Sequence, residues 1–140
     1  MILLPPDLHA ALRANAMAHH DALQLGETEP DPVPVVKFFN PLGAATWLAT
    51  ELYGDDDTLF GFADLGFGCP ELGVFSLSEI ASVRLPFGMG IERDLSFESI
   101  HPISTWAEWA RRAGSILWAE TLLRRAARGG DGLELPPSGG

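Results

Sequence analysis

The sequence predicts an α+β protein: an antiparallel sheet of about four to five strands with an N-terminal helix, a short middle helix and a long C-terminal helix. Apolar residues recur at helical spacing near both ends of the chain, whereas the middle holds short β-branched and aromatic runs. Turn-forming clusters of glycine, proline and aspartate separate those runs. The 140 residues suit one domain, placed at residues 1–128, with residues 129–140 expected to be a disordered tail.

The first helix is predicted within "PPDLHAALRANAMAHHDAL", residues 5–23. Pro6 with Asp7 suits the first turn of a helix. Gly26 and the polar, proline-punctuated segment "ETEPDPVP" should end it. The apolar positions at helical spacing are Leu8, Ala11, Leu12, Ala16 and Leu23.

Three strands, two of them forming a hairpin, are predicted next. "VVKFF" (35–39) is a strand that Asn40-Pro41 ends, and "ATWLATELY" (45–53) and "TLFGFADLGF" (58–67) flank the turn "GDDD". Since both arms are partly apolar on both faces, we expect helices to cover the second face of the sheet. Alternation in the first arm places Trp47, Ala49, Glu51 and Tyr53 on one face and Thr46, Leu48, Thr50 and Leu52 on the other.

Shorter elements are expected in residues 68–99. "GCPELG" (68–73) is predicted as a turn and "VFSL" (74–77) as a short strand. In "SLSEIASVR" (76–84), Ser76 and Glu79 have the spacing of a capping box, and Pro86 should stop this short helix. Alternation in "ERDLSFES" (92–99) predicts a further strand.

The last element is predicted as one long helix. Thr105 and Glu108 have capping-box spacing at its start, and Gly129-Gly130 mark its end. We expect its tryptophans at 106 and 109 in the core. The apolar stripe consists of Trp106, Trp109, Ala110, Ala113, Ile116, Leu117, Leu123 and Ala127.

The composition argues against several classes of function. The net charge of −10 disfavours direct binding to nucleic acid, because phosphate binding needs clustered Lys and Arg. With Cys69 as the only cysteine, an intrachain disulfide and a thiolate metal cluster are excluded. No apolar run approaches the ~20 residues that span a bilayer, and "MILLPP" lacks the basic start of a signal peptide. We therefore expect a soluble, cytoplasmic protein with no membrane partner.

Charge is unevenly distributed along the chain. From Phe38 to Val83 there are acidic residues and no basic one, whereas residues 104–128 are rich in arginine. A solvated acidic face explains the first pattern, and an acidic surface that engages a basic protein is the alternative. The candidate partner-binding residues of the hairpin are Glu51, Asp55, Asp56 and Asp57.

Motifs for phosphate, nucleophile and metal chemistry are incomplete. Gly66-Phe67-Gly68 lacks the lysine of a phosphate loop and suits a tight turn. Cys69 has no histidine in a recognisable sequence relation to serve as its base. The side chains of His19-His20-Asp21 diverge around a helix, and Asp55-Asp56-Asp57 lacks the glycine and distal glutamate of a calcium loop. No metal or other cofactor is predicted.

Glu51, Asp64 and Glu71 are the more serious chemical candidates. Glu51 and Asp64 lie on the two arms of the predicted hairpin, and Glu71 follows the next turn. Two carboxylates facing each other across strands could do acid–base work or bind a divalent cation. Alternatively, Asp64 and Glu71 accept hydrogen bonds from backbone amides in the turn.

The C-terminal helix offers a second candidate surface. Trp118 lies about a third of a turn away from the apolar stripe, and Arg124 and Arg125 follow nearby. Tryptophan and arginine are favoured interface anchors. We expect these residues to serve self-association or partner binding.

The segments "ATWLATEL", "FGFADLGFGCPELGVFSLSEI" and "IERDLSF" carry a resemblance to the domain of unknown function family 2958, over roughly residues 1–115. The resemblance implies a small bacterial protein of a plasmid, phage or integrative element, with no assigned activity. Genes of such elements often encode accessory or counter-defence factors.

These observations together predict a non-catalytic accessory protein that binds a host or element-encoded protein with a basic surface, as a counter-defence inhibitor. One alternative is a small metal-dependent enzyme that uses Glu51, Asp64 and Glu71. Another is a structural subunit whose long helix forms a homodimer.

Overall fold

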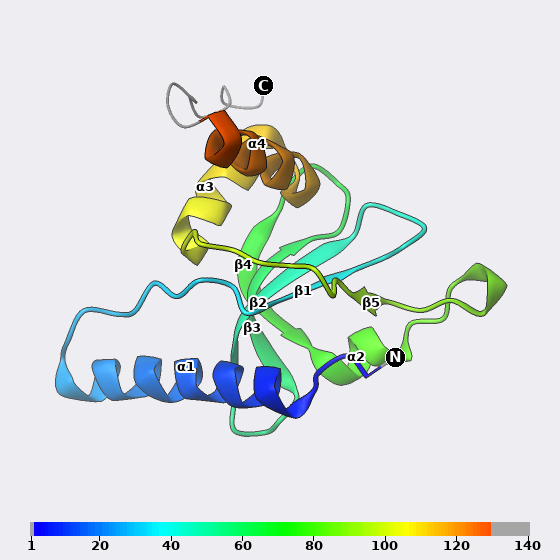
Figure 1. Ribbon diagram of the computed structural model, residues 1–140. Coiled ribbons are helices and arrows are strands. Elements are labelled where there is room, and N and C mark those ends of the chain that lie inside the picture. The colour runs from blue at the N-terminus through cyan, green and yellow to red at the C-terminus, as the bar shows by residue number, and fades with distance from the viewer. Residues whose placement is uncertain (1, 130–140) are drawn as a thin grey trace.

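The computed structural model describes residues 2–129 and confirms the α+β class (Figure 1). The predicted tail, residues 129–140, lies outside the described residues except for Gly129. Within residues 2–129 no helix has the length and apolar character needed to cross a membrane. The elements are α1 (Pro6–Leu25), β1 (Val36–Phe39), β2 (Thr46–Leu52), β3 (Thr58–Asp64), β4 (Glu71–Ser76), α2 (Leu77–Ser82), the 3-10 turn η1 (Pro86–Gly88), β5 (Glu92–Arg93), α3 (Ile103–Ala113) and α4 (Ile116–Gly129).

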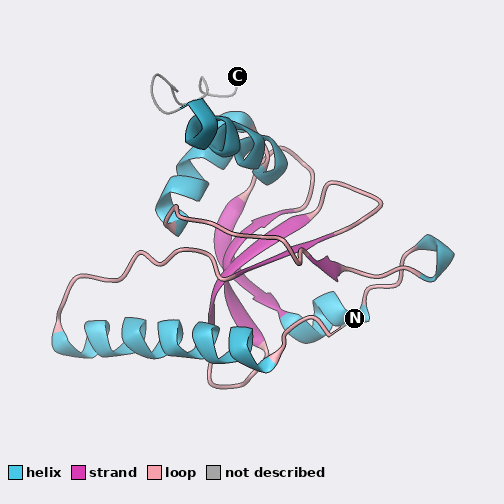
Figure 2. Cartoon of the chain, viewed as in Figure 1, coloured by secondary structure: helices cyan, strands magenta, loops and turns pink. Residues whose placement is uncertain are grey.

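The strands form one antiparallel sheet in the order β4-β3-β2-β1-β5. From β1 to β4 each strand pairs with the next along the chain, and β5 returns to pair with the other side of β1. Helix α1 covers one face of the sheet, and α3 and α4 cover the other (Figure 2). The expectation that helices cover the second face is confirmed.

Two apolar clusters hold these layers together. On the α1 face, Leu12 packs with Phe38 and Leu59. On the opposite face, Trp106 of α3 packs in a cluster with Phe62. Burial of each such side chain contributes roughly 1.5–3 kcal/mol, so these clusters are the main reason that the helices dock. Both core tryptophans, at 106 and 109, are buried as predicted.

A bulge in β2 changes the two faces that simple alternation predicts. The register with β3 shifts between Ala49 and Glu51, so one extra residue is inserted at Thr50. Ala49 and Leu52 therefore pack in the same cluster, although alternation places them on opposite faces. Across the bulge, a Cβ on Gly61 would lie 1.8 Å from the backbone oxygen of Leu48. A glycine is needed here because the two backbones approach so closely.

Strand β4 begins earlier than the sequence predicts. It starts at Glu71, inside the segment 68–73 expected to be a turn, and Glu71 pairs with Ala63 of β3. Gly66 and Gly68 have φ values of 92° and 81°, which let the chain reverse within a short turn. The cap of α2 is confirmed, because the Ser76 hydroxyl accepts a hydrogen bond from the Glu79 amide at 3.1 Å.

Residues 92–99 form a shorter strand than alternation predicts. Only Glu92 and Arg93 pair with β1. The Asp94 carboxylate then accepts hydrogen bonds from the amide and the hydroxyl of Ser96, each at 3.0 Å. This aspartate turn directs the chain out of the sheet.

The predicted long helix is in fact two helices. Gly114, with a φ of 87°, ends α3 in the left-handed conformation, and its amide donates to the Ala110 carbonyl. The hydroxyl of Ser115 then accepts a hydrogen bond from the Trp118 amide at 3.0 Å in the first turn of α4. A continuous apolar stripe hides this break, because both helices face the same core.

The capping box predicted at Thr105 and Glu108 is also wrong. Helix α3 begins at Ile103, directly after Pro102. Its first turn is capped from a distant segment, since Asp31 accepts a hydrogen bond from the Ser104 amide at 3.1 Å. A cap that comes from another part of the chain leaves no local spacing to detect.

Candidate functional site

A groove of about 450 Å³ lies between α1 and the end of β2. Met17 and Leu23 of α1 form apolar walls, and each is 57% exposed. Tyr53 follows β2 and lines the groove together with Glu51 and His19. Apolar walls with a few polar groups are typical of binding sites.

Helix α1 is fixed to β2 by polar contacts as well as by packing. The Arg13 guanidinium donates to the carbonyl of Leu52 at 2.7 Å, and the Asn15 amide donates to the carbonyl of Thr50 at 2.9 Å. Both carbonyls lie at or beyond the bulge of β2. The bulge therefore helps to set the position of the groove wall.

The polar centre of the groove is His19, which lies between two carboxylates. Its Nδ1 lies 3.1 Å from both oxygens of Glu51, and its Nε2 lies 3.1 Å from Oε1 of Glu29. Only a protonated imidazole donates from both nitrogens. Hydrogen bonds to Glu29 and then to Glu51 raise the pKa of His19 above its ordinary value of 6.5. Glu51 is almost fully buried, and the His19 charge compensates its own.

The raised pKa of His19 predicts a pH dependence of stability. The folded state holds this proton more tightly than the unfolded chain, in which His has a pKa of about 6.5. The stabilisation is therefore fully present below about pH 6.5 and is lost as pH rises through the raised pKa. We expect urea unfolding between pH 5.5 and pH 9 to show a fall in unfolding free energy that His19→Gln removes. The exposed neighbour variant His20→Gln should retain this fall, and parallel curves for wild type and His19→Gln would contradict the assignment.

The Glu51 carboxylate also affects the pKa of Tyr53. Burial and then the nearby charge of Glu51 raise the pKa of the Tyr53 hydroxyl above its ordinary value of 10. Tyr53 is therefore neutral at physiological pH and offers the groove a hydrogen-bond donor beside an aromatic face.

At the hairpin tip, Asp55 and Asp57 have structural roles. Asp55 accepts hydrogen bonds from the Thr58 hydroxyl at 2.6 Å and the Thr58 amide at 2.8 Å, which lower its pKa to about 2. Asp57 accepts from the Ser76 hydroxyl and the Ser78 amide, each at 2.8 Å, and its pKa is lowered. The bonds of Asp55 close the tip itself, and those of Asp57 hold the tip against the start of α2.

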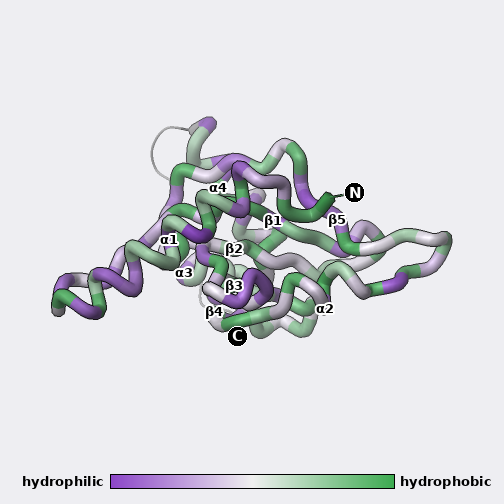
Figure 3. Tube along the Cα trace, turned by 90° about the horizontal axis from the view of Figure 1, so that it is seen from below, coloured by the Kyte–Doolittle hydropathy of each residue, from purple (hydrophilic) through white to green (hydrophobic). Residues whose placement is uncertain are grey.

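Asp56 is the more available of the three tip aspartates. Its side chain is 66% exposed and contacts His9 of α1 at 3.2 Å. Because His9 is itself exposed, this contact leaves the carboxylate in solvent. In the view from below, α1 alternates between hydrophilic and hydrophobic residues along its length (Figure 3). The groove and the tip thus combine exposed apolar and acidic groups on one side of the molecule.

Glu51 is not brought together with Asp64 and Glu71. Glu51 pairs with Phe60 of β3, whereas Asp64 lies four residues further along that strand, about 13 Å away at strand spacing. Asp64 is buried, and its carboxylate accepts from the amides of Gly66 and Ile116, both at 2.9 Å. In residues 2–129 no set of three His, Cys, Asp or Glu side chains is placed to hold a metal ion.

The family follows from the sequence match. A family model described as a protein of unknown function (DUF2958) matches residues 3–117 of the chain. The chain belongs to the DUF2958 family. Comparison with curated proteins found no match, and neither did comparison with solved structures. In this DUF2958 protein the match includes the sheet, α1, α2 and α3, and it ends at the second residue of α4.

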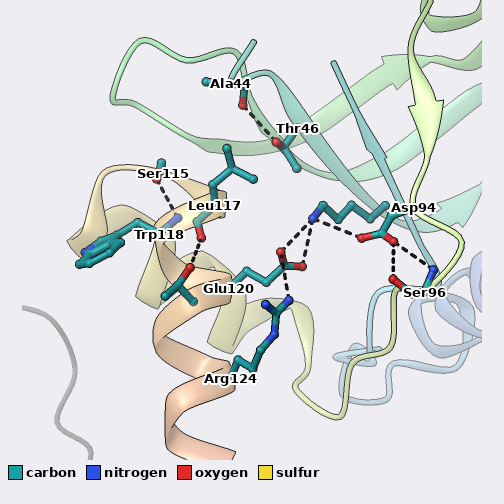
Figure 4. Close-up of polar contacts among 11 residues, drawn as sticks. Ala44, Thr46, Asp94, Ser96, Ser115, Leu117, Trp118, Glu120 and Arg124 are labelled. Atoms are coloured by element: carbon teal, nitrogen blue, oxygen red, sulfur yellow. Dashed lines mark hydrogen bonds and ion pairs between the residues drawn. The ribbon is translucent and has the colours of Figure 1, made fainter. Parts of the chain in front are cut away.

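A buried ion cluster whose pairings no local sequence pattern predicts lies on the other side of the DUF2958 sheet (Figure 4). Lys37 of β1 is 6% exposed, and its Nζ lies 2.9 Å from Oε1 of Glu120 and 3.4 Å from Oδ2 of Asp94. Burial acts to raise the pKa of Asp94, but hydrogen bonds from Ser96 and the Lys37 charge outweigh it and lower that pKa. The single lysine inside the apolar run "VVKFF" is the sequence signal for this cluster.

The second predicted surface of the DUF2958 protein lies on α4. Trp118 is 47% exposed, and the guanidinium carbon of Arg125 lies 5.9 Å from the centre of its ring. Arg124 contacts Glu120 at 3.6 Å and so adjoins the Lys37 cluster. Figure 1 shows α4 and the β2–β3 hairpin tip on opposite sides of the molecule. The hairpin candidates and the α4 candidates therefore form two separate surfaces.

Proposed function

We propose that this DUF2958 protein is a non-catalytic binding protein, and that its partner is a protein with a basic surface. The docking face is the groove between α1 and β2 together with the adjoining hairpin tip. We further propose the finer role that the resemblance implies, an accessory factor of a bacterial plasmid, phage or integrative element that acts as a counter-defence inhibitor.

One observation carries the proposal: exposed apolar side chains adjoin exposed acidic ones. Met17 and Leu23 offer apolar anchors beside a groove, and interface cores are built around such anchors. The Asp56 carboxylate is exposed at the hairpin tip, and Asp21 lines the groove. A basic protein that carries apolar side chains matches both properties.

The positions of the cations support the same partner. The guanidinium of Arg13 donates to a backbone carbonyl, and His19 is held between two glutamates. The arginines of the chain are concentrated instead in α3 and α4. Around the groove and the hairpin tip together, acidic side chains therefore outnumber Arg13 and His19. An excess of negative charge accelerates the approach of a basic protein.

The geometry favours binding over the alternative of a carboxylate-based enzyme. Catalysis by Glu51, Asp64 and Glu71 requires the three carboxylates to act on one substrate. The first of them lies about 13 Å from the second at strand spacing. The second is buried, and each of its oxygens already accepts a hydrogen bond from a backbone amide.

A charge-reversal pair tests the proposal. We expect Asp56→Lys to reduce capture of partner proteins from a bacterial lysate at least threefold at low salt. The loss should shrink at high salt, because the screening length falls from about 10 Å at 0.1 M to about 3 Å at 1 M. Glu98→Lys is the matched control, since it makes the same change in net charge at an exposed position in the loop before α3. The readout is quantitative mass spectrometry of the captured proteins.

Two results would overturn the proposal. Equal losses of partner capture from Asp56→Lys and Glu98→Lys would mean that capture depends on net charge alone and not on the hairpin tip. Capture that neither Asp56→Lys nor Leu23→Asp reduces would place the docking face elsewhere on the molecule.

A further inference from the structure

Strand β4 forms an open edge of the sheet. It runs from Glu71 to Ser76 and, among the described residues, pairs with β3 alone. The strand at the other edge, β5, has two residues. An unpaired edge strand presents free N–H and C=O groups to any other extended chain.

The phase of the ladder shows which backbone groups point outward. The Leu77 amide donates to the carbonyl of Asp57 just beyond the paired region of β3 and β4. Because bonded residues alternate in an antiparallel ladder, residues 71, 73 and 75 bond to β3. The backbone groups of Leu72 and Val74 therefore face away from the sheet.

The outward-facing residues also expose apolar side chains. Val74 is 61% exposed and Leu72 is 38% exposed, and both project from the same face of β4. Edge strands are usually protected by lysine, proline or a bulge. The sequence "ELGVFS" of β4 has no lysine and no proline, and its pairing with β3 is regular throughout.

We propose that β4 pairs with β4 of a second copy of this chain, antiparallel about a two-fold axis through Gly73. Leu72 of each copy then lies opposite Val74 of the other, and the two residues exchange hydrogen bonds in both directions. The two sheets become one continuous sheet across the dimer.

A second copy is favoured over an unrelated strand because its own β4 offers the matching outward backbone groups and exposed apolar side chains in this register. It brings the exposed Leu72 and Val74 side chains of both copies together on one face. Glu71 lies opposite Phe75, so no two carboxylates oppose each other across the new ladder. Gly73 lies opposite Gly73 at the axis, where cross-strand Cα atoms are about 4.5 Å apart. An added Cβ at Gly73 has no neighbouring atom within 4 Å in one copy.

Cross-linking tests both the dimer and its register. In a Cys69→Ser background, Gly73→Cys should form a disulfide-linked dimer on mild oxidation, because the Cα separation at the axis suits a disulfide. Val74→Cys in the same background is the matched control. Its Cα atoms would be about 8–9 Å apart in this register, too far for a disulfide. Cross-linking of Val74→Cys but not of Gly73→Cys would overturn the proposed register.

Sedimentation velocity tests the association without added thiols. We expect the wild-type chain to be a dimer that becomes tighter at high salt, because two copies of net charge −10 repel each other. Val74→Lys should weaken the dimer at least tenfold, whereas Val74→Thr, which keeps the β-branched shape, should retain it. A wild-type monomer at every concentration and salt, or a dimer that Val74→Lys leaves unchanged, would overturn the proposal.

The dimer and the basic partner are separable in these experiments. Salt should strengthen the β4 dimer and weaken capture at the groove. Val74→Lys should still capture the partner, and Asp56→Lys should still dimerise.

Discussion

Replacing Gly61 with alanine should lower the unfolding free energy by about 3 kcal/mol or more, the upper range for an overpacked site. The new methyl group would lie 1.8 Å from the Leu48 carbonyl oxygen and 2.9 Å from the Ala49 Cα. Both neighbours are backbone atoms of the bulged strand, so relief requires β2 and β3 to separate. Typical domains have a total stability of about 5–15 kcal/mol, so this loss is a large share of it.

Gly73→Ala provides a matched control for this prediction. Gly73 pairs directly with Gly61 on the neighbouring strand, and an added methyl group there meets nothing within 4 Å. We expect Gly73→Ala to change the unfolding free energy by less than about 1 kcal/mol. Urea unfolding followed by circular dichroism compares the two variants. Soluble yield serves as the readout if Gly61→Ala does not fold, and equal stability of both variants would contradict the role given to the bulge.

Replacing Lys37 with methionine should cost about 2–3 kcal/mol of stability. Removal of one partner from a buried ion pair costs about 3–5 kcal/mol, and we expect less here because Glu120 and Asp94 retain side-chain exposures of 18% and 24%. Methionine preserves most of the side-chain volume, so the loss measures the uncompensated carboxylates.

A compensating variant shows whether the stability loss of Lys37→Met comes from uncompensated charge or from altered packing. Lys37→Met combined with Glu120→Leu should recover much of the loss, because a buried pair replaced by apolar residues is often neutral. Arg124→Ala is the surface control, and its effect should stay below about 1 kcal/mol because Arg124 is exposed. If the double variant is no more stable than Lys37→Met alone, the cost comes from packing and the electrostatic explanation is wrong.

The part of the fold that follows from local pattern could be predicted from the sequence. Helix α1, the β2–β3 hairpin and the Ser76 cap of α2 each depend on residues that lie close together in the chain. The bulge at Thr50 could not be predicted, because it depends on how β2 meets β3. The break at Gly114 was hidden by an apolar stripe that continues across it.

In the candidate site, too, single residues could be predicted from the sequence, whereas contacts between distant segments could not. The sequence identified Glu51 and Asp56 as partner-binding candidates, and both lie on the side of the molecule proposed to dock a partner. It did not indicate that His19 would pair with Glu51, because the two residues are far apart in the chain and meet only when α1 crosses β2. For the same reason, nothing near Lys37 pointed to Glu120 in α4.

The order of the sheet has a consequence for synthesis of the chain on the ribosome. Strands β1 to β4 pair with their sequence neighbours and can form as soon as residues 36–76 have emerged. Helices α3 and α4, which cover Leu48 and Phe62, are made last. Until then one face of the nascent sheet exposes its core side chains, which makes the chain prone to aggregation. A chain whose translation stops before Ile103 would therefore expose these apolar side chains permanently and depend on chaperones to stay unaggregated.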